Sequence, residues 1–175
     1  MKTTFVSLTC GLLLTAFVTT AMASSVQTDY DHSFNLAGLR TYAFQPQARK
    51  AGDPLATSPI NDRRIHDALD SQLKAQGFND DSDAADFLIS YFVTTRQGLD
   101  VQDNRTGIWF RSGGLNVSQF TEGTLVVIFQ DRATGKEVWR GYLAGEITPK
   151  NLEKDVNKGV AKLVKKFVAN QAGKK

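Results

Sequence analysis

The first strong pattern along the chain is an apolar stripe with the period of an α-helix. Apolar side chains recur at every fourth position, at Ile65, Leu69 and Leu73, so they share one side of a helix. Ser58 is a suitable N-cap and is followed by proline, which fits the first helical position, whereas Gly77 suits the position after a helix end. The pattern therefore predicts a helix between Ser58 and Gly77.

A second stripe of the same period runs through the C-terminal part of the chain. Its start is indicated by Thr148, which precedes a proline. The apolar positions are Leu152, Val156, Val160, Leu163, Val164 and Phe167, and the lysines between them are Lys154, Lys158, Lys162, Lys165 and Lys166. We interpret the lysines as a solvated helix face. The alternative is a surface that binds anionic lipid or polysaccharide.

Five segments have the alternation or the β-branched and aromatic composition of strands. They cover residues 26–30, 41–44, 87–94, 124–130 and 137–147. The third segment is almost wholly apolar or β-branched, so we expect both of its faces to be covered over part of its length. A polar turn joins the last two segments and predicts an antiparallel hairpin. The simplest architecture for these elements is an α+β fold, with a small, mostly antiparallel sheet and two helices packed on one of its faces.

The N-terminus has the three parts of a secretory signal. Lys2 supplies a positive charge, residues 5–18 form an apolar run, and Ala21-Met22-Ala23 is a small-x-small cleavage site. The run is shorter than the roughly 20 residues needed to cross a bilayer. Cys10 lies inside the run behind bulky residues, so we do not expect it to be lipidated. The pattern predicts cleavage after Ala23, one domain over residues 24–175 and a periplasmic location.

Composition and spacing remove several kinds of chemistry. The chain has one cysteine, in the predicted signal, so the mature domain is expected to have no disulfide or thiolate. A formal net charge of +3 is too small to predict nucleic-acid binding. His32 and His66 lack zinc-ligand spacing, and Asn79 to Asp83 begins like a calcium loop without its later glycine and glutamate. We expect no metal and no cofactor.

Catalytic signatures are missing as well. The chain has no G-x-S-x-G elbow, P-loop or dinucleotide fingerprint. Carboxylates at the ends of predicted strands, such as Asp86, Glu122 and Glu146, are ordinary strand-end residues. A carboxylate-dependent hydrolase is kept as an alternative, and it requires one of them within reach of a second titratable group. We favour a protein that is not an enzyme.

Residues 97–119 are less regular, and their centre combines aromatic, basic and glycine residues. The weak binding candidates in it are Arg105, Trp109, Phe110 and Arg111. One interpretation is that the two aromatic side chains cover an end of the core. The other is a recognition surface, because aromatic and arginine side chains on a loop are common anchors for a partner.

Several blocks of sequence resemble one known family. They are Thr28 to Asp31, Leu39 to Phe44, Ala85 to Ile89, Glu122 to Val127 and Asp131 to Gly141. The chain resembles the bacterial domain of unknown function 4136, a family of exported proteins and lipoproteins, over nearly the whole mature region. It departs from the family in having Phe44 where tryptophan is frequent, and in lacking the lipid-acceptor cysteine. The resemblance implies an α+β envelope domain and no reaction.

The matched residues have structural interpretations. Trp139 and Gly141 are two apart on a predicted strand and share a face, where the glycine leaves room for a ring or a helix. Asp86 is placed to accept hydrogen bonds from backbone N–H groups at a strand start. Glu122 and Arg140 are expected to pair across the hairpin.

Taken together, these patterns favour a periplasmic, non-catalytic module that binds an envelope protein or glycan or supports an assembly. The alternatives are the carboxylate-dependent hydrolase and a weak membrane-surface contact through the lysine helix.

Overall fold

The computed structural model describes residues 25–46, 58–103, 115–146 and 150–173. For residues 98–103 and 115–120 the description is limited to the backbone. The predicted signal peptide and its cleavage site, the predicted start of the last helix at Thr148, and the candidates Arg105, Trp109, Phe110 and Arg111 lie outside the described residues.

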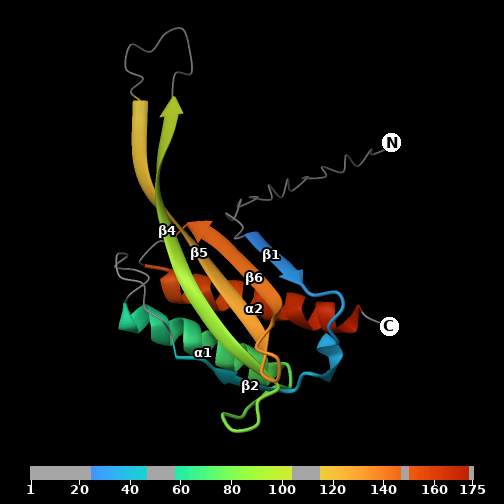
Figure 1. The fold of residues 1–175 in the computed structure, drawn as a ribbon. Helices are drawn as coiled ribbons and strands as arrows, with labels where there is room; N and C mark the ends of the chain where they lie inside the picture. The colour runs from blue at the N-terminus through green and yellow to red at the C-terminus, as the bar shows by residue number, and fades with distance from the viewer. Residues whose placement is uncertain (1–24, 47–57, 104–114, 147–149, 174–175) are drawn as a thin grey trace, which may run out of the picture.

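The described chain forms a mixed sheet of six strands that is covered by two helices (Figure 1). The strands are β1 (Ser25–Tyr30), β2 (Thr41–Phe44), β3 (Asn79–Asp80), β4 (Phe87–Asp103), β5 (Leu115–Asp131) and β6 (Glu137–Glu146). Their spatial order is β1-β6-β5-β4-β2-β3. The predicted α+β class is therefore confirmed, with β1 as an edge strand and β5 and β6 as an antiparallel hairpin.

The sheet is larger and more mixed than the sequence pattern predicted. β2 pairs in parallel with both β3 and β4, whereas the other neighbours are antiparallel. Parallel neighbours need a crossover connection, and the helix α1 (Pro59–Ala75) provides it between β2 and β3. The two-residue β3 was too short to have a strand pattern of its own.

Both helices lie on the same side of the sheet (Figure 1). α1 starts after Ser58 with proline at its first position, as predicted, and Gly77 beyond its end has a φ of 87°. That backbone conformation is easy for glycine alone. The second helix, α2 (Leu152–Ala172), packs against α1, β1 and β6.

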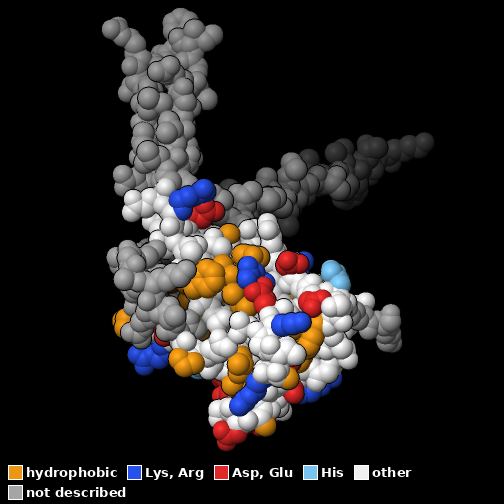
Figure 2. Space-filling view, viewed as in Figure 1, with side chains coloured by type: hydrophobic (Ala, Val, Ile, Leu, Met, Phe, Trp, Pro, Cys, Tyr) orange, Lys and Arg blue, Asp and Glu red, His pale blue; other side chains and the backbone are white. Residues whose placement is uncertain are grey.

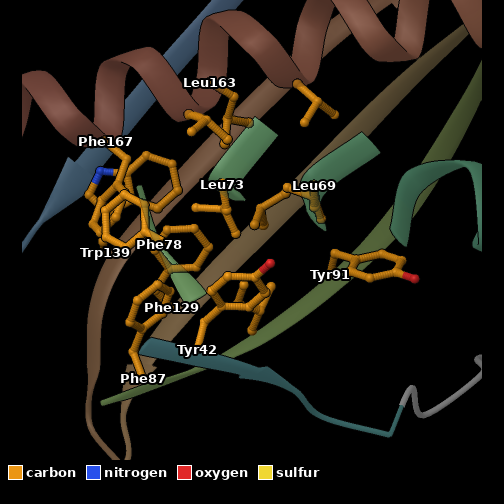
Figure 3. Packing of buried hydrophobic residues seen from close by; sticks show 14 of the residues in the cluster. Tyr42, Leu69, Leu73, Phe78, Phe87, Tyr91, Phe129, Trp139, Leu163 and Phe167 are labelled. Carbon is orange, nitrogen blue, oxygen red and sulfur yellow. The ribbon is translucent and has the colours of Figure 1, made fainter. Parts of the chain in front are cut away.

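The core between helices and sheet is built on a cluster of aromatic rings (Figure 3). Phe129 of β5 stacks on Trp139 of β6 with ring centroids 4.8 Å apart, and Phe167 of α2 meets Phe129 edge-on at 4.7 Å. All three side chains are fully buried. Such pairs add stability beyond the burial of their area, and they fix α2 over the central strands.

Two glycines allow α2 to approach β6 closely. Gly141 of β6 lies under Leu163 of α2 and beside the Trp139 ring, and Gly159 of α2 lies over Leu143 of β6. A side chain at either glycine would collide with its neighbour. The prediction that Gly141 leaves room for a ring or a helix is confirmed: the space is used by the Trp139 ring and by Leu163 of α2.

Two tyrosines tie α1 to the sheet through buried polar contacts. The Tyr42 hydroxyl donates to Oδ1 of Asp70 at 2.8 Å, and the Tyr91 hydroxyl donates to Oδ1 of Asp62 at 2.9 Å. Burial, with help from these carboxylates, raises the pKa of both tyrosines above the ordinary value. Burial alone would raise the pKa of Asp70, but hydrogen bonds from Lys74 and Tyr42 hold it below the usual range.

β4 and β5 are longer than predicted and form an arm that leaves the sheet (Figure 1). They pair without interruption from Phe87–Asp131 to Asp103–Leu115, whereas β6 pairs with β5 only as far as Glu122. Residues 97–103 and 115–121 therefore continue as a two-stranded ribbon. The irregular composition of this stretch concealed the strands, because cross-strand pairing outweighs weak local β propensity.

Candidate interaction surface

The sheet has one face that the described helices leave open. Side chains alternate along a strand, and on β4 the buried residues Phe87, Ile89 and Tyr91 point towards the helices. Leu88, Ser90 and Phe92 therefore point to the other side. Figure 2 looks onto this open face and shows apolar side chains gathered at its middle, beside basic and acidic ones.

We define the open-face patch by its apolar members, which are Leu88, Phe92, Val126, Ile128 and Tyr142. Phe92, Val126 and Tyr142 lie side by side on three neighbouring strands. Phe92 is 42% exposed, whereas Val126 between the two rings is 5% exposed. The patch is thus a compact apolar surface in which Val126 is covered by its neighbours, whereas Phe92 remains partly in contact with solvent.

Arg140 borders the patch on β6. Its guanidinium donates to Glu137 and, through Nη1, to the Tyr142 hydroxyl at 3.3 Å. These two hydrogen bonds raise the pKa of Arg140 against the opposing effect of burial. Among the described residues, Nε of Arg140 is the one buried side-chain nitrogen or oxygen without a hydrogen-bond partner.

The predicted pair of Glu122 and Arg140 is wrong. Arg140 lies opposite Ile128 in the sheet, and Glu122 lies opposite Arg96 of β4 and Glu146 of β6. Glu122 instead accepts from Arg96 at 2.9 Å, at the base of the arm. Glu122 and Arg140 are six positions apart along the β5–β6 hairpin. This separation depends on the strand register, which the sequence pattern did not fix.

Asp86 has the structural role that was predicted for it. Its Oδ2 accepts from the backbone N–H groups of Arg40 at 2.7 Å and Thr41 at 2.9 Å, at the start of β2. Burial alone would raise the pKa of Asp86, but these hydrogen bonds hold it below the usual range. Through Oδ2 the carboxylate therefore joins the starts of β2 and β4.

Of the three strand-end carboxylates, Asp86 lies far from the other two. About ten strand residues, or roughly 30 Å, separate Asp86 from the Arg96–Glu122 pair. Glu122 and Glu146 are neighbours across β5 and β6, but Glu146 is exposed and Glu122 is held in an ion pair with an arginine that is 81% exposed. The arrangement is that of a solvated strand end.

The histidines and acidic turn are also accounted for by local packing. The His66 ring packs against the Phe44 ring with centroids 4.0 Å apart, and the His32 ring packs against the Tyr30 ring with centroids 4.2 Å apart. Oδ1 of Asp81 accepts from the backbone N–H groups of the turn that follows it. Within the described ranges, no three His, Cys, Asp or Glu side chains are grouped to hold a metal ion.

The remaining residues singled out in the sequence have separate places. Trp139 is buried and donates through Nε1 to Asn170 of α2 at 3.1 Å, so it belongs to the core. The lysines of α2 are all exposed. Sequence reasoning missed the open-face patch, because it expected both faces of β4 to be covered over part of its length. Phe92 shows that the expectation fails at that position.

Comparisons with known proteins give a family and a fold. No helix among the described residues is long and apolar enough to span a membrane. No curated protein shows significant similarity to the chain. A PDZ domain protein from Parabacteroides distasonis matches with a TM-score of 0.55 at 11% identity, over 81% of this chain and 35% of its own length. The chain thus spans about a third of that protein.

Two other solved structures cover nearly all of their own length. The PelC dodecamer from Paraburkholderia phytofirmans matches with a TM-score of 0.51 at 12% identity, over 83% of this chain and 97% of PelC. A DUF4136 family protein from Bacteroides thetaiotaomicron matches with a TM-score of 0.41 at 16% identity, over 85% of this chain and 96% of its own. Residues 26–167 match the domain of unknown function DUF4136, so the chain belongs to that family.

Proposed function

We propose that this protein is a non-catalytic assembly module of the bacterial periplasm that binds through the open face of its sheet. The observation that carries the proposal is the open-face patch, in which Phe92 of β4 is 42% exposed. The periplasmic location rests on the signal-like pattern of residues 1–23.

The patch departs from what a solvated sheet face requires. When one face of a sheet is in water, the outward positions are normally polar. On β4 and β5 the outward positions include Leu88, Phe92 and Ile128. Burying the exposed part of one such large side chain is worth on the order of 1 kcal/mol. An apolar group of this kind, rimmed by charges, is typical of the centre of a protein interface.

The occupant that we propose is a second copy of the chain, packed sheet against sheet. Two ion pairs border the patch, Arg140–Glu137 and Arg96–Glu122. Exposed Asp29 lies opposite Arg140 and exposed Glu146 lies opposite Glu122. The rim therefore carries charges of both signs, and a copy turned by 180° can place opposite charges against each other. PelC, which shares the fold, assembles as a dodecamer, and this supports self-association as a use of such a domain.

The test is the mass of the protein in solution as a function of concentration, by sedimentation velocity. We expect the wild-type mass to rise towards that of a dimer, and Phe92→Glu to stay monomeric because a charge would be buried in the interface. The matched control is Ile60→Glu, since Ile60 is 57% exposed but lies in the first turn of α1 on the helical side. A wild-type protein that stays monomeric at about 100 μM would exclude a biologically useful self-contact.

The proposed location has its own test. The intact mass of the protein released from the periplasm of a bacterial host is expected to correspond to a chain that begins at Ser24. A mass that retains residues 1–23 would contradict both cleavage and the assignment of this segment as a signal.

A further inference from the structure

The second surface that stands out is the outer side of α2. With 100° per residue, the buried residues Val160, Leu163 and Phe167 lie on one side of the helix. The lysine stripe, which we define as Lys154, Lys158, Lys162, Lys165 and Lys166, lies on the opposite side, and each of its members is exposed. The stripe extends about 18 Å along the helix axis.

The lysine stripe is not neutralised within the described part of the protein. No ion pair or hydrogen bond joins any of the five lysines to another described residue. Glu153 in the first turn faces α1, where it contacts Arg64 at 3.9 Å. Asp155, the remaining acid of α2, is exposed and lies on the same side as the lysines, and after it the sequence has lysines but no acidic residue up to Lys175. The outer side of α2 is therefore strongly basic, although the chain as a whole is nearly neutral.

We infer that the lysine stripe binds the surface of an anionic phospholipid bilayer, with α2 lying parallel to that surface. The side chains beside the lysines are small or polar, such as Ala161, Ala169 and Asn157, so the helix offers charge without an apolar face to insert. A laterally continuous negative surface suits such a row, because it needs no matched pocket. A neutral saccharide would need ring stacking or a matched pocket, which this side does not provide.

The inference does not rest on the proposed assembly, because the two surfaces lie on opposite sides of the sheet. α2 packs on the helical side against β1 and β6, whereas Phe92 lies on the open face. A Phe92→Glu protein is therefore expected to keep its vesicle binding even where it has lost self-association.

The experiment is co-sedimentation of the protein with vesicles of phosphatidylcholine alone or with about one-third phosphatidylglycerol. We expect binding to the anionic vesicles only, and its loss between about 0.05 M and about 0.5 M salt as the charges are screened. Each lysine near an anionic surface contributes roughly a fivefold change in affinity. Lys162→Gln with Lys166→Gln is thus expected to weaken binding by about 30-fold. Glutamine has nearly the helix propensity of lysine, so the fold should be kept.

The control removes the same charge elsewhere. Arg132→Gln with Lys136→Gln takes two exposed basic residues from the turn before β6, and is expected to change the affinity by less than twofold. An equal loss in both double variants would overturn the inference, since only the net charge would then matter. Binding to an anionic polysaccharide such as alginate without binding to the vesicles would overturn it as well.

Discussion

Replacing Gly141 by alanine tests how closely α2 and β6 are fitted together. A methyl group at this position would stand 2.5 Å from Cη2 of Trp139 and 3.0 Å from Cγ of Leu163. Carbon atoms in contact are normally about 3.5–4.0 Å apart. Because Trp139 and Leu163 are fully buried, neither can move without displacing the aromatic cluster.

The expected cost follows from two opposing effects. Overpacking of a core by one methyl group costs about 1–3 kcal/mol, whereas alanine is intrinsically better than glycine in a strand by roughly 0.5–1 kcal/mol. We therefore expect Gly141→Ala to lower the free energy of unfolding by about 1–2 kcal/mol, and the melting temperature by about 3–8 °C for a domain of this size.

Urea unfolding followed by circular dichroism measures this difference. Gly38→Ala is the control, because a methyl group at Gly38 would meet nothing within 4 Å, and it is expected to be neutral or slightly stabilising. Combining Gly141→Ala with Trp139→Phe removes the ring atoms nearest to the new methyl group. The loss of unfolding free energy in the double variant should therefore be smaller than the sum of the losses in the two single variants. Strict additivity, or a Gly141→Ala protein as stable as Gly38→Ala, would refute the reasoning.

Two further predictions concern polar contacts that fasten the sheet. The pKa of Asp86 is depressed in the folded state, so its contribution is present above the unfolded pKa of about 3.9 and is lost as the pH falls through the lower folded value. Asp86→Asn should therefore cost about 1–2 kcal/mol at pH 7 and flatten the acid limb of stability in urea titrations from pH 7 to about pH 2; an unchanged pH profile would contradict this. Tyr42→Phe removes the hydroxyl that donates to Asp70 and should cost about 1 kcal/mol. NMR titration should show the pKa of Asp70 rising towards its ordinary value, and an unmoved pKa would show that Lys74 alone lowers it.

The helices and the strand hairpin could be predicted because their information is local. The stripe from Ile65 to Leu73 and the proline after Ser58 are read over one element, and both agree with α1. The β5–β6 hairpin follows from the turn that contains Gly135, whose φ is 67°. In each case the backbone preference and the apolar period point to the same element.

The errors arose where the answer depends on register or on distant partners. The pairing of Glu122 with Arg96 is set by the β4–β5 register, and that register begins at the far end of the hairpin with Phe87 and Asp131. The open-face patch was missed for a similar reason. A run of apolar residues such as those around Phe92 indicates burial on both sides, and only the arrangement of the helices shows that one side is left uncovered.

The opposite placement of the open-face patch and the lysine stripe leads to one prediction that depends on both proposals. In a sheet-to-sheet dimer the two α2 helices lie on the two outer surfaces and point away from each other. A single flat membrane can then contact one lysine stripe, and the other remains free to bind a second membrane. We therefore expect the wild-type protein to cluster anionic vesicles, seen as a rise in particle size by dynamic light scattering. Phe92→Glu should bind the vesicles one copy at a time and leave their size unchanged, and Lys162→Gln with Lys166→Gln should reduce both binding and clustering.

Clustering by the Phe92→Glu protein equal to that of the wild type would show that opposed α2 helices are not its cause. Binding by a dimeric wild-type protein without any clustering would show that the copies associate in another orientation, with their lysine stripes on the same side.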